Sequence, residues 1–245
     1  MTLKRPKISI IGVGYVGLCT AVGFANKGYS VTASDNLAEK VSKLKEGIPP
    51  FHEPGLSEMI KQTIHNGRLK CVVNGTQNAV LETDLTFVAV GTPSKPDGGI
   101  DLQFIEAASQ DIGKALKQKN QYHVVVIKST VVPGTTQNAV KPILEESGKK
   151  CGKDFGLCMN PEFLRQGTAF TDTSEADRVV LGGYDKKAID KIENLYKDFY
   201  APKVPPIIRT TLATAELIKY ASNSMLATKI SFINTIASIC EKIPG

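Results

Sequence analysis

Three glycines with a fixed spacing stand near the start of the chain, in the segment 12–17 (GVGYVG). A short β-branched run precedes them, a helical pattern follows, and Asp35 closes the next predicted strand about 20 residues later. In this arrangement the first glycine permits a tight turn, the second lets backbone N–H groups approach a pyrophosphate, and the third lets helix pack on strand. The segment therefore predicts a dinucleotide site.

Asp35 is expected to select the dinucleotide. Its carboxylate would hydrogen-bond the ribose hydroxyls of the adenosine and repel a 2′-phosphate, which favours NAD over NADP. Lys40 is the only nearby cation. The alternative interpretation of Asp35 is an N-cap for a helix that starts before Leu37.

Two polar loops follow predicted buried strands and should meet at the carboxyl edge of a sheet. One is the segment 90–94 (VGTPS), and the other is the segment 128–130 (KST). Both can bind a ligand or water at that edge. The first can equally be a plain Pro/Gly loop, and the hydroxyls of the second can simply cap the next helix.

A carboxylate, a guanidinium and an amide lie in one turn after a further strand, at Glu162, Arg165 and Gln166. Glu162 is a candidate general acid or base. The alternative is a surface turn held by a Glu–Arg pair.

Glu216, Lys219 and Asn223 recur at helical spacing near the end of the chain and share one predicted helix face. An ammonium and an amide on that face can converge on one oxygen. The alternative is a solvated polar face.

Composition excludes several classes of protein. The 245 residues are 42% hydrophobic and 22% charged, as in a globular protein and unlike disordered, collagenous or coiled-coil chains. The net charge of +6 is spread without a basic run, which argues against nucleic-acid binding. The apolar stretch 8–25 is interrupted by four glycines, so neither a signal peptide nor a membrane span is expected.

Cysteines and histidines are scattered, so the sequence predicts neither a disulfide framework nor a metal site. This usage favours a cytoplasmic protein. The cysteines are Cys19, Cys71, Cys151, Cys158 and Cys240.

Short β-branched runs alternate with amphipathic helical stretches, which predicts an α/β fold with a doubly wound, Rossmann-type parallel sheet. The predicted strands are 7–11, 30–34, 71–73, 85–90, 124–128, 156–159, 179–182 and 206–209. The predicted helices between them are 14–27, 36–45, 55–65, 102–117, 135–146 and 187–199.

A Pro-rich stretch at 201–206 marks the expected boundary between a domain at 1–205 and a segment at 206–245. The second segment is one long helical pattern, roughly 212–241, without internal Gly or Pro. Its apolar residues cover much of the circumference, so we expect it to pack against a second copy or another domain.

Six segments resemble the UDP-glucose/GDP-mannose dehydrogenase family, and within it the enzymes that oxidise UDP-glucose. They are 12–17 (GVGYVG), 47–56 (GIPPFHEPGL), 90–94 (VGTPS), 128–130 (KST), 160–167 (NPEFLRQG) and 215–219 (AELIK) with Asn223. The resemblance runs over essentially the whole chain, and the second and fifth segments are its most specific parts.

The resemblance implies a four-electron oxidation of a sugar C6 alcohol to a carboxylate, here UDP-glucose to UDP-glucuronate. Two NAD⁺ would be reduced in turn, and a cysteine thiolate would hold the intermediate. Lys219 and Asn223 would stabilise oxygen charge at C6. Thr130 would position water, and Glu162 would act in acid/base steps of thioester hydrolysis.

The matching positions imply two sets of binding residues. The sugar would be lined by Glu162, Phe163, Leu164, Arg165, Gln166, Lys219 and Asn223. NAD would contact Gly12, Val13, Gly14, Tyr15, Val16, Gly17, Asp35, Lys40, Val90, Gly91, Thr92, Pro93, Ser94, Ser129, Thr130, Val131 and Gln166.

Two departures from the family pattern matter. Gln166 stands where much of the family has a second Glu, and an amide cannot take a proton. The nucleophilic Cys of the family belongs to a GGxC segment that none of the five cysteines matches. We therefore expect this chain to be the N-terminal half of such an enzyme, able to bind NAD but not to complete turnover.

Two other functions remain open. One is a non-catalytic NAD(H)-binding module, and the other is a 6-phosphogluconate-like or hydroxyacid dehydrogenase. The latter group shares the Lys219 and Asn223 spacing, but it does not explain the segments around Glu53 and Glu162.

Overall fold

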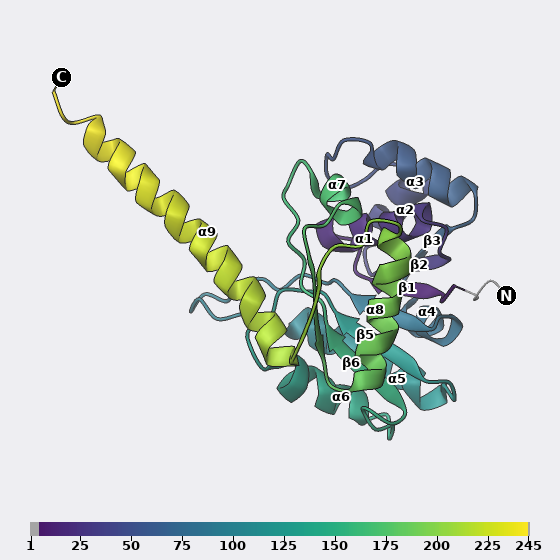
Figure 1. The fold of residues 1–245 in the computed structure, drawn as a ribbon. Coiled ribbons are helices and arrows are strands. Elements are labelled where there is room, and N and C mark those ends of the chain that lie inside the picture. The colour runs from purple at the N-terminus through teal and green to yellow at the C-terminus, as the bar shows by residue number, and fades with distance from the viewer. Residues whose placement is uncertain (1–4, 245) are drawn as a thin grey trace.

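An eight-stranded sheet forms the centre of the protein, whose computed structural model describes residues 5–244 (Figure 1). The strand order is β3-β2-β1-β4-β5-β6-β7-β8. The strands are β1 Ile8–Ile11, β2 Val31–Asp35, β3 Leu69–Val73, β4 Leu85–Val88, β5 His123–Ile127, β6 Phe155–Met159, β7 Val179–Gly183 and β8 Ile207–Thr210. All eight predicted strands are confirmed, with ends that differ by one or two residues. The order reverses between β1 and β4, which is where doubly wound sheets bind ligands.

Two strands, β7 and β8, run opposite to the other six and so depart from the predicted parallel sheet. β7 runs antiparallel to β6, with Met159 opposite Gly182, whereas the other neighbours are parallel. A parallel β7 would require its connection to cross to the opposite edge of the sheet. The antiparallel strand instead starts at the edge where β6 ends, so the connection 160–178 stays at the carboxyl edge.

Helices cover both faces of the sheet. They are α1 Tyr15–Asn26, α2 Ala38–Lys45, α3 Leu56–His65, α4 Thr76–Glu82, α5 Gln103–Gln118, α6 Lys141–Glu145, α7 Ala169–Ser174, α8 Lys186–Tyr200 and α9 Leu212–Cys240. The predicted helix 135–146 is found, but it opens with a π-helical turn, η1, at Thr136–Val140. The sequence analysis missed α4 and α7, which are short and rich in poor helix formers.

The two faces of the sheet have separate cores, because successive side chains of a strand point to opposite faces. In β5, Val124 and Val126 pack with α1 and α8, including Phe24 and Phe199. The alternate residues Val125 and Ile127 pack with α5, α6 and the start of α9. Burial on both faces explains why these strands are continuously apolar.

The predicted long helix is confirmed as α9, which leaves the body of the protein after its first turns (Figure 1). Thr211 caps it by accepting a hydrogen bond from the Thr214 N–H. Beyond Tyr220 the large apolar side chains of α9 are exposed in the single chain: Met225, Leu226, Ile230, Phe232, Ile233, Ile236 and Ile239. Among the described helices, none has the length and apolarity to cross a membrane.

Candidate active site

The glycine turn after β1 has the geometry that the sequence predicts. Gly12 has a φ of +92°, and a Cβ there would lie 2.6 Å from the Ala89 carbonyl oxygen. A Cβ on Gly17 would lie 1.9 Å from the Gly12 oxygen, so α1 approaches the turn too closely for any side chain. Gly14 caps α1, and no atom lies within 4 Å of where its Cβ would stand. The open backbone at the helix N-terminus fits a pyrophosphate.

Asp35, at the end of β2, braces this turn. Its Oδ2 accepts hydrogen bonds from the Val13 N–H at 2.9 Å and Lys40 Nζ at 3.0 Å, and its Oδ1 accepts from the Leu37 N–H at 3.0 Å. Burial opposes ionisation, but the two N–H donors and Lys40 outweigh it and hold the pKa of Asp35 below its ordinary value. The N-cap alternative is wrong, because α2 begins at Ala38 and Leu37 is its cap residue.

The two polar loops after β4 and β5 are fastened to each other. Ser129 Oγ donates to the Val90 carbonyl at 2.7 Å, and Thr92 Oγ1 donates to the Thr130 carbonyl at 2.9 Å. These hydroxyls therefore shape the loops and cap no helix. The Thr130 side chain is half-buried, while Val131 is fully buried in the core. Around them, Gly91, Pro93 and Ser94 are exposed.

Glu162 and Lys219 form a nearly buried ion pair. Lys219 Nζ lies 2.7 Å from Glu162 Oε1, and the side chains are 6% and 12% exposed. Glu162 Oε2 also accepts the Leu164 N–H at 2.6 Å, which aims the carboxylate. The turn after β6 and the first turns of α9 thus bring together an acid and an ammonium. The alternative of a surface Glu–Arg turn is wrong for Glu162.

The other predicted sugar residues are placed differently. Phe163 lies beneath the Arg178 guanidinium, with 4.1 Å from Arg178 Cζ to the ring centroid. Arg165 is exposed and pairs with Asp172 at 2.8 Å, and Gln166 is exposed. Asn223 is also exposed, one turn beyond Lys219 where α9 leaves the body. Within residues 5–244, the ion pair has no hydrogen bond from Asn223.

Glu216 does not lie on a solvated polar face of its helix, which was the alternative that the sequence left open. It is fully buried, and its carboxylate accepts the Gly134 N–H at 2.5 Å and the Thr136 N–H at 2.7 Å. Glu216 and Lys219 are therefore not part of a solvated polar face. Glu216 holds the loop after Thr130 against the base of α9.

Glu53 makes contacts at this edge of the sheet that the sequence analysis missed. It is 4% exposed and accepts the Tyr15 hydroxyl at 2.7 Å and the Gly167 N–H at 3.1 Å. Burial, reinforced by Glu53, raises the pKa of Tyr15 to about 12, so the hydroxyl remains a donor. Glu53 thereby joins the first residue of α1 to the segment that follows Glu162. Its place in the distinctive segment 47–56 was the only signal in the sequence.

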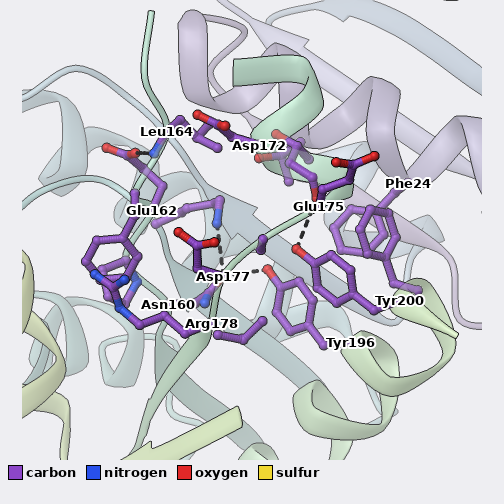
Figure 2. A pocket seen from close by; sticks show the side chains of 18 of the residues that line it. Phe24, Asn160, Glu162, Leu164, Asp172, Glu175, Asp177, Arg178, Tyr196 and Tyr200 are labelled. Atoms are coloured by element: carbon purple, nitrogen blue, oxygen red, sulfur yellow. Dashed lines mark hydrogen bonds between the residues drawn. The ribbon is translucent and has the colours of Figure 1, made fainter. Parts of the chain in front are cut away.

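A cavity of about 100 Å³ lies between the turn after β6 and α8 (Figure 2). Figure 2 shows Tyr196 pointing at Asn160, with Glu162 on the far side of the same turn. Lys128, Asn160, Glu162 and Tyr196 line this cavity. The sequence analysis assigned no role to Lys128, Asn160 or Tyr196, although Lys128 is a charge directly after the apolar run 124–127 of β5.

Most thiols of the protein are poorly suited to nucleophilic chemistry. Burial raises the pKa of Cys71 to about 11 and that of Cys19 and Cys151 to about 12, and it raises that of Cys158 further. Cys240 is exposed near the end of α9. Because the thiolate is the reactive form, these raised pKa values disfavour the four thiols as nucleophiles.

The reversal of strand order, the glycine turn and Asp35 define a Rossmann-type, NAD-binding protein of the dehydrogenase class. The model of the UDP-glucose/GDP-mannose dehydrogenase family, NAD binding domain, matches residues 6–200. The model of the central domain of the same family matches residues 213–245. The chain belongs to the UDP-glucose/GDP-mannose dehydrogenase family.

Relatives with different named substrates are about equally similar to this chain. It is 43% identical over 236 residues to a GDP-mannose 6-dehydrogenase of Azotobacter vinelandii, covering 96% of this chain and 53% of the relative. It is 42% identical over 241 residues to a UDP-glucose 6-dehydrogenase of Haloferax volcanii, covering 96% and 54%.

A solved structure supports the same fold. The GDP-mannose dehydrogenase of Pseudomonas aeruginosa superposes with a TM-score of 0.89 at 41% identity, covering 93% of this chain and 51% of that one. The chain spans about half the length of the curated relatives that it matches.

Proposed function

We propose that the chain is the NAD-binding half of a nucleotide-sugar 6-dehydrogenase, which oxidises the C6 alcohol of UDP-glucose to the carboxylate of UDP-glucuronate. The observation that carries the proposal is the Glu162–Lys219 pair, 2.7 Å apart at the sheet edge that also holds the glycine turn. An acid and an ammonium beside a dinucleotide site are the groups that alcohol oxidation requires.

The described residues fit NAD. The open backbone at Gly14 and the N-terminus of α1 suit the pyrophosphate, and Asp35 suits the adenosine ribose. When bound, NAD⁺ supplies the acceptor for the hydride that leaves C6. Gly91 adds a second open stretch of backbone at the same edge.

The residues of the chain handle the proton and the oxygen charge. Each of the two oxidation steps removes a hydride and a proton from the substrate. Lys219 donates a hydrogen bond to the C6 oxygen as negative charge develops there, and Glu162 receives the departing proton. Thr130 orients the water that supplies the second carboxylate oxygen. Asn223 becomes a second donor to C6 once other residues cover α9.

The rest of the enzyme would supply the cysteine nucleophile and most contacts to the nucleotide. We divide the chain into an NAD-binding domain at 1–205 and a linker helix at 206–245. The bare apolar residues of α9, such as Ile230 and Ile233, support a homodimer built around this helix. The five free cysteines agree with a cytoplasmic location.

GDP-mannose is the second candidate substrate, because relatives that act on it are as similar to the chain as those that act on UDP-glucose. Both substrates would present a C6 alcohol to the same ion pair. The choice between them therefore concerns only the sugar and the base.

The experiment measures NADH formed by the intact enzyme with UDP-glucose and with GDP-mannose. We expect two NADH per sugar oxidised, with NAD⁺ preferred over NADP⁺. NADH from GDP-mannose alone would replace the proposed substrate and keep the reaction. No oxidation of either sugar, with NAD⁺ still bound, would favour a non-catalytic NAD(H)-binding module.

The isolated 245-residue chain supplies a second test. It should bind NAD⁺ in calorimetry but form no NADH at enzymatic rates with either nucleotide sugar. Sustained turnover by this chain would contradict the assignment of the nucleophile to the other half.

A further inference from the structure

A buried ammonium lies where the loops that carry Thr130 and Glu162 begin. Lys128 follows β5 and is 8% exposed, and Asn160 follows β6 and is 2% exposed. Lys128 Nζ donates a hydrogen bond to Asn160 Oδ1 across 3.0 Å. Because Ile127 is paired with Met159 in the sheet, this bond joins the first residues beyond the two strands.

The side chain of Asn160 is held from three directions. Its Oδ1 also accepts the Tyr196 hydroxyl of α8 at 2.5 Å, and its Nδ2 donates to the Val180 carbonyl of β7 at 2.9 Å. The opposite amide orientation would place an NH₂ group against two donors, so the network specifies this one. Pro161 comes next and restricts the backbone between Asn160 and Glu162. The position of Asn160 thus determines where the Glu162 turn begins.

The buried charge of Lys128 destabilises the folded protein, because the ammonium loses its hydration. Burial lowers the pKa of Lys128 to about 8, while the negative charge of Glu162 acts in the opposite direction and Lys219 adds repulsion. Among residues 5–244, Asn160 Oδ1 is the one acceptor within hydrogen-bond distance of this ammonium, which has three donors. An apolar side chain of similar length would avoid the desolvation. The charge lies beside Glu162 and Lys219. A role at this ion pair would explain why a lysine occupies the position.

The cavity next to this network has room for acceptors of the remaining two donors of the Lys128 ammonium. Lys128 and Glu162 both line it, and a volume of about 100 Å³ is enough for a few water molecules. Water there can accept hydrogen bonds from the ammonium and reach the carboxylate. Other charged groups around the cavity are Arg165, Asp172, Glu175, Asp177 and Arg178.

We propose that Lys128 is a positioning residue for the oxidation: through Asn160 it holds the Glu162 turn in register with the Thr130 loop, and its charge lies behind the Glu162–Lys219 pair. The inference rests on the proposed function, because the register matters only if Glu162 and Thr130 act on one substrate. Lys128 itself does not touch the sugar.

The test compares Lys128→Met, which keeps the length without the charge, with Lys128→Arg, which keeps the charge. Lys114→Met is the matched control, because it makes the same substitution at an exposed lysine of α5 outside this network. The first readout is the NMR signal of the Leu164 amide in the 245-residue chain, because this N–H bonds directly to Glu162 Oε2. Lys128→Met should shift this signal and weaken its protection from exchange, whereas the other two variants should retain both.

The second readout is catalysis by the intact enzyme. Lys128→Met should lower kcat by roughly tenfold or more with little change in KM, and Lys128→Arg should restore most of it. If Lys128 only filled space, Met would serve as well as Arg, and the two variants would have the same kcat. If Lys128→Met does not fold, Lys128→Gln replaces it, since Gln can still donate to Asn160 but carries no charge.

The outcomes separate this inference from the proposed function. An unchanged Leu164 amide in a folded Lys128→Met chain overturns the positioning role, whatever the enzyme oxidises. Equal kcat losses in Lys128→Met and Lys128→Arg, with Leu164 unmoved, overturn it as well. Failure of the wild-type enzyme to oxidise any nucleotide sugar refutes the proposed function, while the Leu164 readout still decides the role of Lys128 in the turn.

Discussion

Glu162 Oε1 and Lys219 Nζ lie 2.7 Å apart, although one residue follows β6 and the other belongs to the third turn of the last helix. The contact makes the base of α9 part of the site. The helix therefore contributes side chains to the site as well as extending from the body of the protein (Figure 1). Its first turns carry the ammonium and, through Glu216, hold the loop after Thr130.

The contributions of Glu162 and Lys219 to the free energy of unfolding should be strongly coupled. Removing one partner leaves a nearly buried charge unpaired, so Glu162→Gln and Lys219→Met should each lower the free energy of unfolding by roughly 2–4 kcal/mol. The double variant should recover much of that loss. Urea unfolding of the four proteins measures the coupling. Lys43→Met, which breaks the exposed pair with Glu39, is the control and should have no measurable effect. Additive losses would mean that the two residues do not interact.

Asp35 should decide the affinity for NAD⁺. Replacing it by Ala removes charged hydrogen bonds to the ribose, so calorimetry should show binding weakened by roughly 1–3 kcal/mol, or about 5- to 150-fold. The preference over NADP⁺ should shrink in the same variant. Glu58→Ala on the exposed side of α3 is a matched loss of one carboxylate and should bind as the wild type does. Unaltered discrimination by Asp35→Ala would remove Asp35 from the cofactor site.

Lys128 should reduce stability at neutral pH. Its pKa is about 8 in the folded protein and 10.5 ordinarily, so the unfolded chain binds more protons between these values. Stability contributed by this group therefore rises with pH across that window, and the whole penalty applies below pH 8. Lys128→Met should be more stable than the wild type at pH 7 by about 3 kcal/mol, less any loss from its bond to Asn160.

The measurement is urea unfolding of the wild type and Lys128→Met at neutral pH and near pH 10. The quantity compared is the difference between their free energies of unfolding at each pH. That difference should shrink at the higher pH, where Lys128 is neutral in the fold. A constant difference would show that the ammonium is not destabilised by burial.

His123 should make the fold sensitive to acid. Burial, with repulsion from Lys119, lowers its pKa to about 3, and the ring bridges the Thr83 carbonyl and the Thr86 hydroxyl. Because the unfolded chain binds this proton near pH 6.5, stability is lost as pH falls from there toward 3. NMR should find the folded ring neutral at pH 5, whereas it titrates in urea. A ring that titrates near its ordinary pKa in the folded chain would contradict this assignment.

The exposed part of α9 should drive association of the chain. Ile233 is 58% exposed and Phe232 is 66% exposed in the single chain, which favours burial against a second copy. Sedimentation velocity should detect a dimer, and Ile233→Glu should shift it to monomer. Lys229→Glu on the same helix changes charge without removing apolar surface and is the control. A wild-type chain that stays monomeric at high concentration would require another cover for this surface.

Much of the fold could be predicted because its signals are local. β-branched runs predict the strands, the spacing of three glycines predicts the turn before α1, and the absence of Gly and Pro predicts the length of α9. The missed helices α4 and α7 are short and made of weak helix formers, so packing decides them. The antiparallel β7 depends on where the connection 160–178 runs, which no local pattern encodes.

The site divides in the same way. The sequence by itself determined which residues are candidates: the glycine turn, Asp35, Glu162 and Lys219 all stand where strand ends or helical spacing predict. Only the tertiary structure decided that Glu162 meets Lys219, that Glu216 binds a loop instead of solvent, and that Lys128 holds Asn160. The reason is physical, because each of these contacts joins groups on distant elements, and their distance depends on how the sheet and α9 pack.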